Sequence, residues 1–137
     1  MRVFITGASS GIGEGLAKHY AAAGAHIGVV ARRAAVLADL AKVIEDKGAK
    51  AHVYAGDVVD TAFMKDAATS FARDAGGVDL VVANAGIGVR HSALREGAAD
   101  EIAELMRINV IGVTNTVVPF VPIVVAQKSG VLSAVAS

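Results

Sequence analysis

Short apolar runs alternate with helical patterns along the whole chain. The runs cover residues 2–6, 26–30, 51–54, 79–83 and 131–135. They are continuous rather than apolar at every second position, which is typical of parallel strands that crossover helices cover on both faces. The sequence therefore predicts an α/β fold, a Rossmann-like doubly wound parallel sheet with about five strands in this chain.

The segments between these runs carry apolar side chains at helical spacing. Three stripes can be recognised: Ile12, Leu16 and Tyr20; Leu37, Leu40 and Ile44; and Phe63, Ala67 and Phe71. The glycines Gly24, Gly48 and Gly76 follow these stripes, where a helix often ends on a left-handed residue. Because no linker or low-complexity segment divides the chain, we expect one domain over residues 1–137.

Composition excludes several classes of function. Hydrophobic residues make up 54% of the chain, and 13 basic residues balance 13 acidic ones, so nothing favours binding to nucleic acid. The lack of cysteine excludes disulfides, thiolate zinc sites and a cysteine nucleophile. The four histidines at 19, 26, 52 and 91 lack the spacing of metal ligands, so we predict no metal site.

A glycine-rich turn connects the first apolar run to the first helical pattern. Residues 6–13 are TGASSGIG. In such a turn Gly7 permits a sharp bend, Gly11 allows backbone to approach a pyrophosphate, and Gly13 allows the helix to pack closely on the strand. The helix N-terminus adds free N–H groups and a positive dipole end.

Ser9 and Ser10 add hydroxyl donors to this turn, and Ile12 lies within it. The strand before it and the helix after it favour a dinucleotide site over a glycine-rich connection that binds nothing.

The turn also resembles the cofactor fingerprint of the classical short-chain dehydrogenase/reductase (SDR) family, spaced Gly-x-x-x-Gly-x-Gly. Further resemblances follow in the family's order: Asp57 and Val58 as the adenine-contacting pair, Asn84, Ala85 and Gly86 as the Asn-Ala-Gly motif, Asn109 as the helix asparagine, and Ser137 as the catalytic serine. Taken singly, each also fits a turn, a cap or a buried amide. Together they identify the chain as similar to an SDR cofactor-binding domain.

The end of the second run bears on which cofactor such a domain would bind. NAD sites of this type place an acidic residue there for the ribose hydroxyls. Here the position holds Ala31, followed by Arg32 and Arg33. A guanidinium pairs well with phosphate, so we predict NADP rather than NAD, with Arg32 as the main contact and Arg33 as the more expendable one. The alternative is that both arginines only form a solvated helix start.

The family's Tyr-x-x-x-Lys motif is missing from this chain. Its only tyrosines are Tyr20 and Tyr54, followed four residues later by Gly24 and Val58. The chain therefore resembles an incomplete SDR, lacking the C-terminal catalytic part, and we expect it to be inactive alone. It would be either a shortened version or the ordered part of a longer chain.

The resemblance implies an NADP(H)-dependent oxidoreductase that transfers hydride between nicotinamide and a carbonyl or alcohol substrate. In it Ser137 would orient the carbonyl, Asn109 would hold a helix distortion and a relay water, and Gly86 would border the nicotinamide ribose. The alternative is a non-catalytic regulatory module that binds NADP. We expect Arg90 and His91 to form an exposed basic loop.

The segment 108–126 is apolar over about the length of a membrane span. Asn109, Asn115 and two prolines interrupt it, which favours a helix placed between the sheet and a partner subunit. We therefore predict a homodimer or homotetramer through residues 108–127. Because Met1 leads directly into the first apolar run, we expect no targeting segment and a cytoplasmic protein.

Overall fold

In the computed structural model, which describes residues 1–88 and 96–136, five strands form one parallel sheet. The strands run in the order β3-β2-β1-β4-β5 and are β1 (Arg2–Thr6), β2 (His26–Ala31), β3 (Lys50–Ala55), β4 (Leu80–Ala83) and β5 (Val131–Ala134). Each lies within one residue of its predicted bounds. The predicted fold class is confirmed. Arg90, His91 and Ser137 lie outside the described residues.

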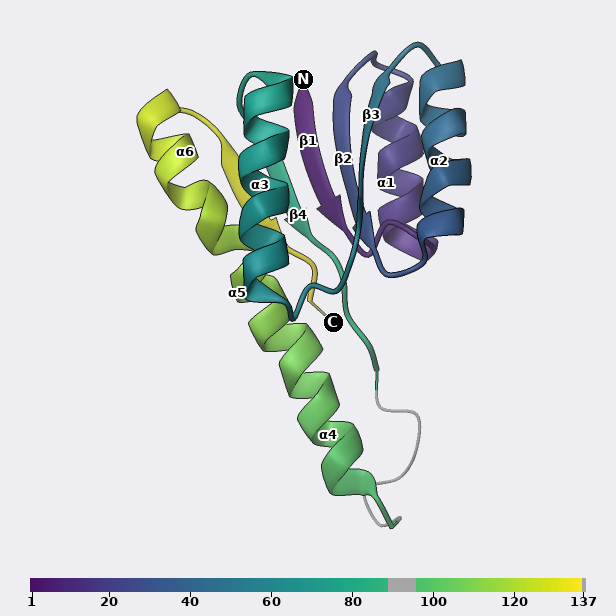
Figure 1. The fold of residues 1–137 in the computed structure, drawn as a ribbon, viewed down its shortest axis with the longest axis vertical. Helices are drawn as coiled ribbons and strands as arrows, with labels where there is room; N and C mark the ends of the chain where they lie inside the picture. The colour runs from purple at the N-terminus through teal and green to yellow at the C-terminus, as the bar shows by residue number, and fades with distance from the viewer. Residues whose placement is uncertain (89–95, 137) are drawn as a thin grey trace.

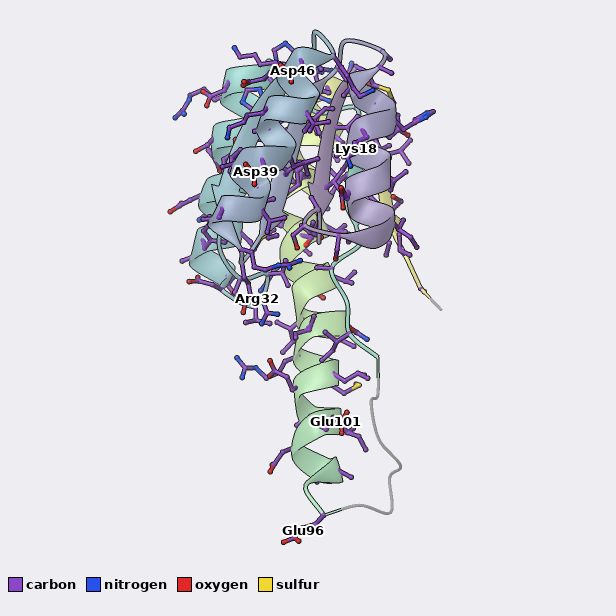
Figure 2. All side chains as sticks on the ribbon, turned by 90° about the vertical axis from the view of Figure 1, so that its right-hand side faces the viewer. Lys18, Arg32, Asp39, Asp46, Glu96 and Glu101 are labelled. Atoms are coloured by element: carbon purple, nitrogen blue, oxygen red, sulfur yellow. The ribbon has the colours of Figure 1, made fainter. Side chains whose placement is uncertain are left out.

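Helices cover both faces of this sheet (Figure 1). On one face lie α1 (Gly11–Ala21) and α2 (Ala34–Asp46), and on the other lie α3 (Thr61–Ala75), α5 (Gly112–Val117) and α6 (Val121–Gln127). Charged side chains such as Asp39 and Asp46 lie on the outer side of α2 (Figure 2).

The alternation of side chains along β1 divides the core in two. Val3 and Ile5 pack with α1 and α2, while Phe4 packs on the opposite face beside Phe71 of α3. The predicted stripe on α2 is fully in the core, and the three glycines predicted to end helices all have positive φ.

One member of the predicted stripes is wrong as a core residue. Ile12 is 63% exposed, because the residues that α1 buries lie on the neighbouring face, at Gly13, Ala17 and Ala21. Its stripe partners Leu16 and Tyr20 lie further along α1 and pack against the core as expected. On α3, Ala67 and Phe71 are buried, and Phe63 is partly buried.

A single helical segment runs from Ala98 to Gln127. It consists of α4 (Ala98–Met106), a π-helical turn η1 (Arg107–Ile111), α5, a 3-10 turn η2 (Val118–Phe120) and α6. The tightening at η2 coincides with Pro119, which lacks the N–H that a regular α-helix requires. By length and composition alone, Ala98–Gln127 could cross a membrane.

The two ends of this segment have different surroundings. Phe120 is fully buried with its ring centroid 4.8 Å from that of Phe4, and Gln127 exchanges two hydrogen bonds with the backbone of Val78. By contrast, α4 has no buried residue and extends away from the body of the molecule, as Figures 1 and 2 show.

Candidate functional site

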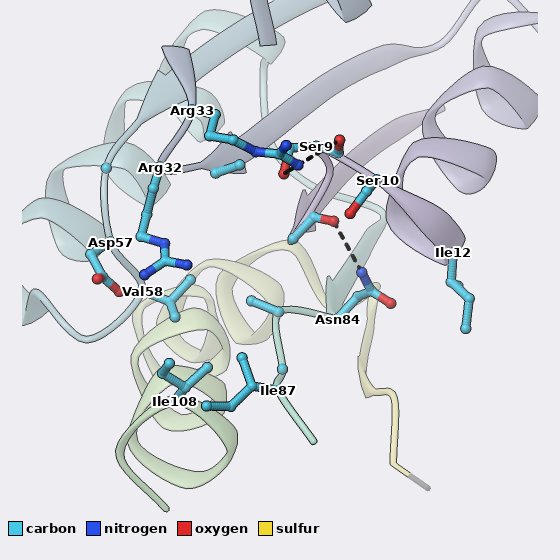
Figure 3. Close-up of a pocket in the computed structure, with 15 residues that line it drawn as sticks. Ser9, Ser10, Ile12, Arg32, Arg33, Asp57, Val58, Asn84, Ile87 and Ile108 are labelled. Carbon is cyan, nitrogen blue, oxygen red and sulfur yellow. Dashed lines mark hydrogen bonds between the residues drawn. The ribbon is translucent and has the colours of Figure 1, made fainter. Parts of the chain in front are cut away.

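A cleft of about 510 Å³ opens at the carboxyl ends of the strands. It lies beside β1, whose neighbours β2 and β4 lead to crossovers on opposite sides, and ligands of open α/β sheets bind at this point. Figure 3 shows the lining residues, which come from four loops, the end of β2, the start of α1 and the turn η1: Gly7, Ser9, Ser10, Ile12, Ala31, Arg32, Arg33, Gly56, Asp57, Val58, Asn84, Ala85, Gly86, Ile87 and Ile108.

The glycine-rich turn is fixed to the end of β4. Gly7 has φ +68°, and a Cβ atom there would lie 2.8 Å from the Cα of Ala85. The hydroxyl oxygen of Thr6 accepts hydrogen bonds from the backbone N–H groups of Asn84 and Ala85, at 3.2 and 3.3 Å. The Asn84 amide donates in return to the Thr6 carbonyl at 3.1 Å. Two loops from distant parts of the sequence thus form one rigid floor.

Gly11 and Gly13 shape this floor in different ways. Gly11 has φ +58° and open space where its side chain would be, so a ligand can approach its backbone. A Cβ atom on Gly13 would lie only 2.4 Å from the Gly7 carbonyl oxygen, so glycine is needed for close packing behind the turn. Ser10, the N-cap of α1, makes no side-chain capping bond, which leaves N–H groups of the first turn for an anion.

Two arginines at the end of β2 line the rim of the cleft (Figure 3). Arg33 donates from Nη2 to the carbonyl oxygen and the hydroxyl oxygen of Ser9, at 3.2 and 3.1 Å. Arg32 has no hydrogen-bond or ion-pair partner within residues 1–88 and 96–136. Among the described residues, its guanidinium is therefore the one of the two without a partner.

The far walls come from the loops after β3 and β4. The Asp57 carboxylate accepts a hydrogen bond from the backbone N–H of Val59 at 3.1 Å, which closes a tight turn and leaves Val58 against the cleft. On the other side, Asn109 donates to the Ile87 carbonyl at 2.8 Å and accepts from the Ile87 N–H at 2.9 Å. Asn109 belongs to the π-helical turn η1, so the helix is distorted at this residue.

Most of the predicted site residues meet in this one cleft. Gly11, Gly13 and Asn109 are not among its lining residues: Gly11 lies between the lining residues Ser10 and Ile12, whereas Gly13 and Asn109 shape the cleft from behind. Ser137 lies outside the described residues. Sequence reasoning singled out Ala31 only as the residue in place of a carboxylate, and it missed three lining residues: Gly56, Ile87 and Ile108. Each directly adjoins a predicted site residue, and that adjacency is the signal that could have identified them.

Neither described tyrosine lies in the cleft lining. Tyr20 packs against the core from α1, and Tyr54 packs on β3 with its ring centroid 5.8 Å from that of Phe4. Burial raises the pKa of Tyr54 to about 12, whereas a phenol that exchanges protons near neutral pH needs a lowered pKa. In the described part of the chain, no group of three or more His, Asp or Glu side chains could hold a metal ion.

Comparison with known proteins agrees with this geometry. A family profile described as short chain dehydrogenase matches residues 1–137. A fatty acyl-CoA reductase of Acinetobacter baylyi is 33% identical over 128 residues, which are 92% of this chain and 43% of that protein.

Two solved structures show the same fold. An NAD⁺-bound xylitol dehydrogenase is 25% identical with a TM-score of 0.93, covering 99% of this chain and 52% of that one. A metagenomic short-chain oxidoreductase in complex with NADP is 27% identical with a TM-score of 0.90, covering 100% and 61%. This chain therefore spans about half the length of the proteins it matches.

Proposed function

Because the chain belongs to the short-chain dehydrogenase family, we propose that it forms the cofactor-binding part of an NADP(H)-dependent oxidoreductase. The reaction is hydride transfer between the nicotinamide and a carbonyl or alcohol substrate. The observation that carries this proposal is the cleft floor, where Gly11 is open to a ligand and α1 presents the N–H groups of its first turn.

The residues of the cleft fit a dinucleotide. The backbone of residues 9–13 would bind the pyrophosphate, Asp57 and Val58 would contact the adenine, and the loop after β4, with Asn84 and Gly86, would border the nicotinamide ribose. A bound nicotinamide cofactor would supply or accept the hydride.

The end of β2 favours NADP over NAD. Ala31 stands where an NAD site would place a carboxylate, and Arg32 beside it has a guanidinium without a partner in the described residues. A planar guanidinium matches a phosphate group through two parallel hydrogen bonds. Arg33 contacts Ser9 instead, so we assign it to holding the glycine-rich turn and Arg32 to the 2′-phosphate.

For the proton transfer we assign only part of the machinery to this chain. Asn109 fixes the backbone at Ile87 and the distorted turn η1, and Ser137 would orient the substrate carbonyl. We place the phenol and the ammonium group outside residues 1–137, because Tyr20 and Tyr54 are packed away from the cleft.

Exposed apolar side chains on Ala98–Gln127 support a homo-oligomer. Val118 and Val125 are 56% and 68% exposed, and Val118 lines an apolar groove between α3 and the segment α5–η2–α6. A second copy would cover this surface. We also place the protein in the cytoplasm, because buried Asn115 and Thr116 attach this helix to the domain rather than leaving it for a membrane.

The test is titration calorimetry of the full-length protein with NADPH and NADH, followed by an NADPH-consumption assay on a panel of carbonyl compounds. We expect tighter binding of NADPH and turnover of some carbonyls. Binding without any turnover would favour the regulatory module, and absence of binding to either cofactor would refute both functions.

A further inference from the structure

The loop that carries Val58 into the cleft is attached to a distant helix. Val58 is 6% exposed, and its carbonyl oxygen accepts a hydrogen bond from the side-chain amide of Asn115 at 2.9 Å. Asn115 lies in α5, is itself 8% exposed, and stands 57 residues further along the sequence. A buried hydrogen bond of this kind is costly to break, because the Asn115 amide and the Val58 carbonyl would both be left unpaired.

The same amide also contacts the far end of this loop. The Asn115 Oδ1 atom accepts a hydrogen bond from the hydroxyl of Thr61 at 3.3 Å, and Thr61 is the first residue of α3. One side chain therefore joins α5 to both the cleft end and the helix end of the loop between β3 and α3.

Close packing reinforces this attachment. Gly112 lies one turn before Asn115, and a Cβ atom at Gly112 would lie 2.7 Å from Cγ2 of Val58. The helix backbone therefore rests directly behind the Val58 side chain, which leaves no room for Val58 to move away from the cleft.

We propose that Asn115 is a positioning residue for the adenine end of the cofactor cleft, acting through the backbone of Val58. The proposal rests on the proposed function, which places the adenine against Asp57 and Val58. Asn115 touches neither the cleft nor the reacting atoms. It orders the loop before the cofactor arrives, so that binding does not have to supply that ordering.

Asn115→Leu removes both hydrogen bonds with a side chain of the same branched heavy-atom arrangement and somewhat larger volume. The matched control is Thr116→Val, since Thr116 is the neighbouring buried residue and, within the described part of the chain, its hydroxyl donates only to the Gly112 carbonyl of its own helix, at 2.7 Å. Dissociation constants of the full-length protein are measured by calorimetry for NADPH and for adenosine 2′,5′-bisphosphate, which reports on the adenine end alone. Thermal unfolding without ligand is recorded beside them.

For Asn115→Leu we expect both dissociation constants to rise by the same factor, about two- to tenfold, which corresponds to the loss of one neutral hydrogen bond. Thr116→Val is expected to lower the unfolding temperature without changing either constant. Unchanged binding by Asn115→Leu, or weaker NADPH binding with unchanged binding of the bisphosphate, would overturn the inference. Wild-type protein that binds neither NADPH nor NADH would refute the proposed function instead.

A second variant keeps the test independent of the stability of Asn115→Leu. Gly112→Ala preserves the hydrogen bond between Asn115 and Val58 but places a methyl group against the Val58 side chain, which must then shift. We expect it to weaken both ligands together. If it binds both as tightly as wild type, Val58 does not depend on α5 and the inference fails.

Discussion

Replacing Gly13 by alanine tests the packing behind the glycine-rich turn. The new methyl carbon would lie 2.4 Å from the Gly7 carbonyl oxygen and 2.6 Å from the Asn84 amide nitrogen. Since ordinary contacts begin at 3.4 Å, the turn and the helix must separate by about 1 Å. Overpacking of this kind costs about 1–3 kcal/mol, only partly offset by the roughly 0.5–1 kcal/mol that alanine gains over glycine in a helix.

The effect on cofactor binding is expected to exceed the effect on folding. A shift of this size moves backbone N–H groups away from the phosphate oxygens, and each charge-assisted hydrogen bond contributes about 1.5–3 kcal/mol. Loss of one such bond predicts affinity for NADPH about ten- to a hundredfold weaker.

Gly15→Ala is the matched control, because Gly15 lies on the same helix and, among the described residues, no atom beyond its own helix backbone and chain neighbours lies within 4 Å of its Cβ position. It is expected to stabilise the helix and leave affinity unchanged. The assay is calorimetric titration of NADPH into each variant of the full-length protein, with thermal unfolding alongside. Wild-type affinity in Gly13→Ala, or an equal loss in Gly15→Ala, would refute the packing argument.

Three further predictions concern other parts of the chain. Arg32→Ala should weaken NADPH binding by about ten- to a hundredfold and leave NADH binding nearly unchanged; equal losses in calorimetry would make Arg32 structural. Val118→Asp with Val125→Asp should shift the full-length protein toward monomer in analytical ultracentrifugation, and a wild-type protein already monomeric at micromolar concentration would contradict the proposed oligomer. Burial, then the neighbouring His26, lowers the pKa of His52 below its ordinary value of 6.5, so the folded state binds fewer protons than the unfolded state. Stability should therefore fall as the pH drops below about 6.5 and level off below the folded pKa, and His52→Phe should reduce this slope in urea unfolding; identical slopes would reject the explanation.

The sequence was sufficient for the strands and for the glycine-rich turn, because continuous apolar runs and local backbone requirements are short-range properties. Gly7 and Gly11 are needed for positive φ and Gly13 for close approach, and these needs are visible in the spacing alone. The same reasoning failed for Ile12, since the small residues Gly13, Ala17 and Ala21, rather than the large apolar side chains, form the buried face of α1. Its ranking of Arg33 as the more expendable phosphate contact stays a prediction, and it could not anticipate the contact of Arg33 with Ser9 that the fold creates.

Sequence patterns could not predict the long-range contacts, for a different reason. The bond between Asn115 and Val58 depends on where α5 packs against the sheet, and no local pattern encodes that position. The two hydrogen bonds between Asn109 and the backbone of Ile87 also depend on how the helix packs. The family resemblance identified Asn109 but not its partner.

The π-helical turn at Arg107–Ile111 holds one more residue than an α-helical turn does, in nearly the same rotation about the helix axis. Deleting one residue from this turn would therefore restore a regular α-helix and leave α4 in nearly the same rotational phase relative to α5. The deletion would instead remove the backbone distortion at Asn109 and change the position of the side chain that holds the backbone of Ile87. The extra residue in this helix thus shapes a wall of the cleft and has little effect on the direction in which α4 points.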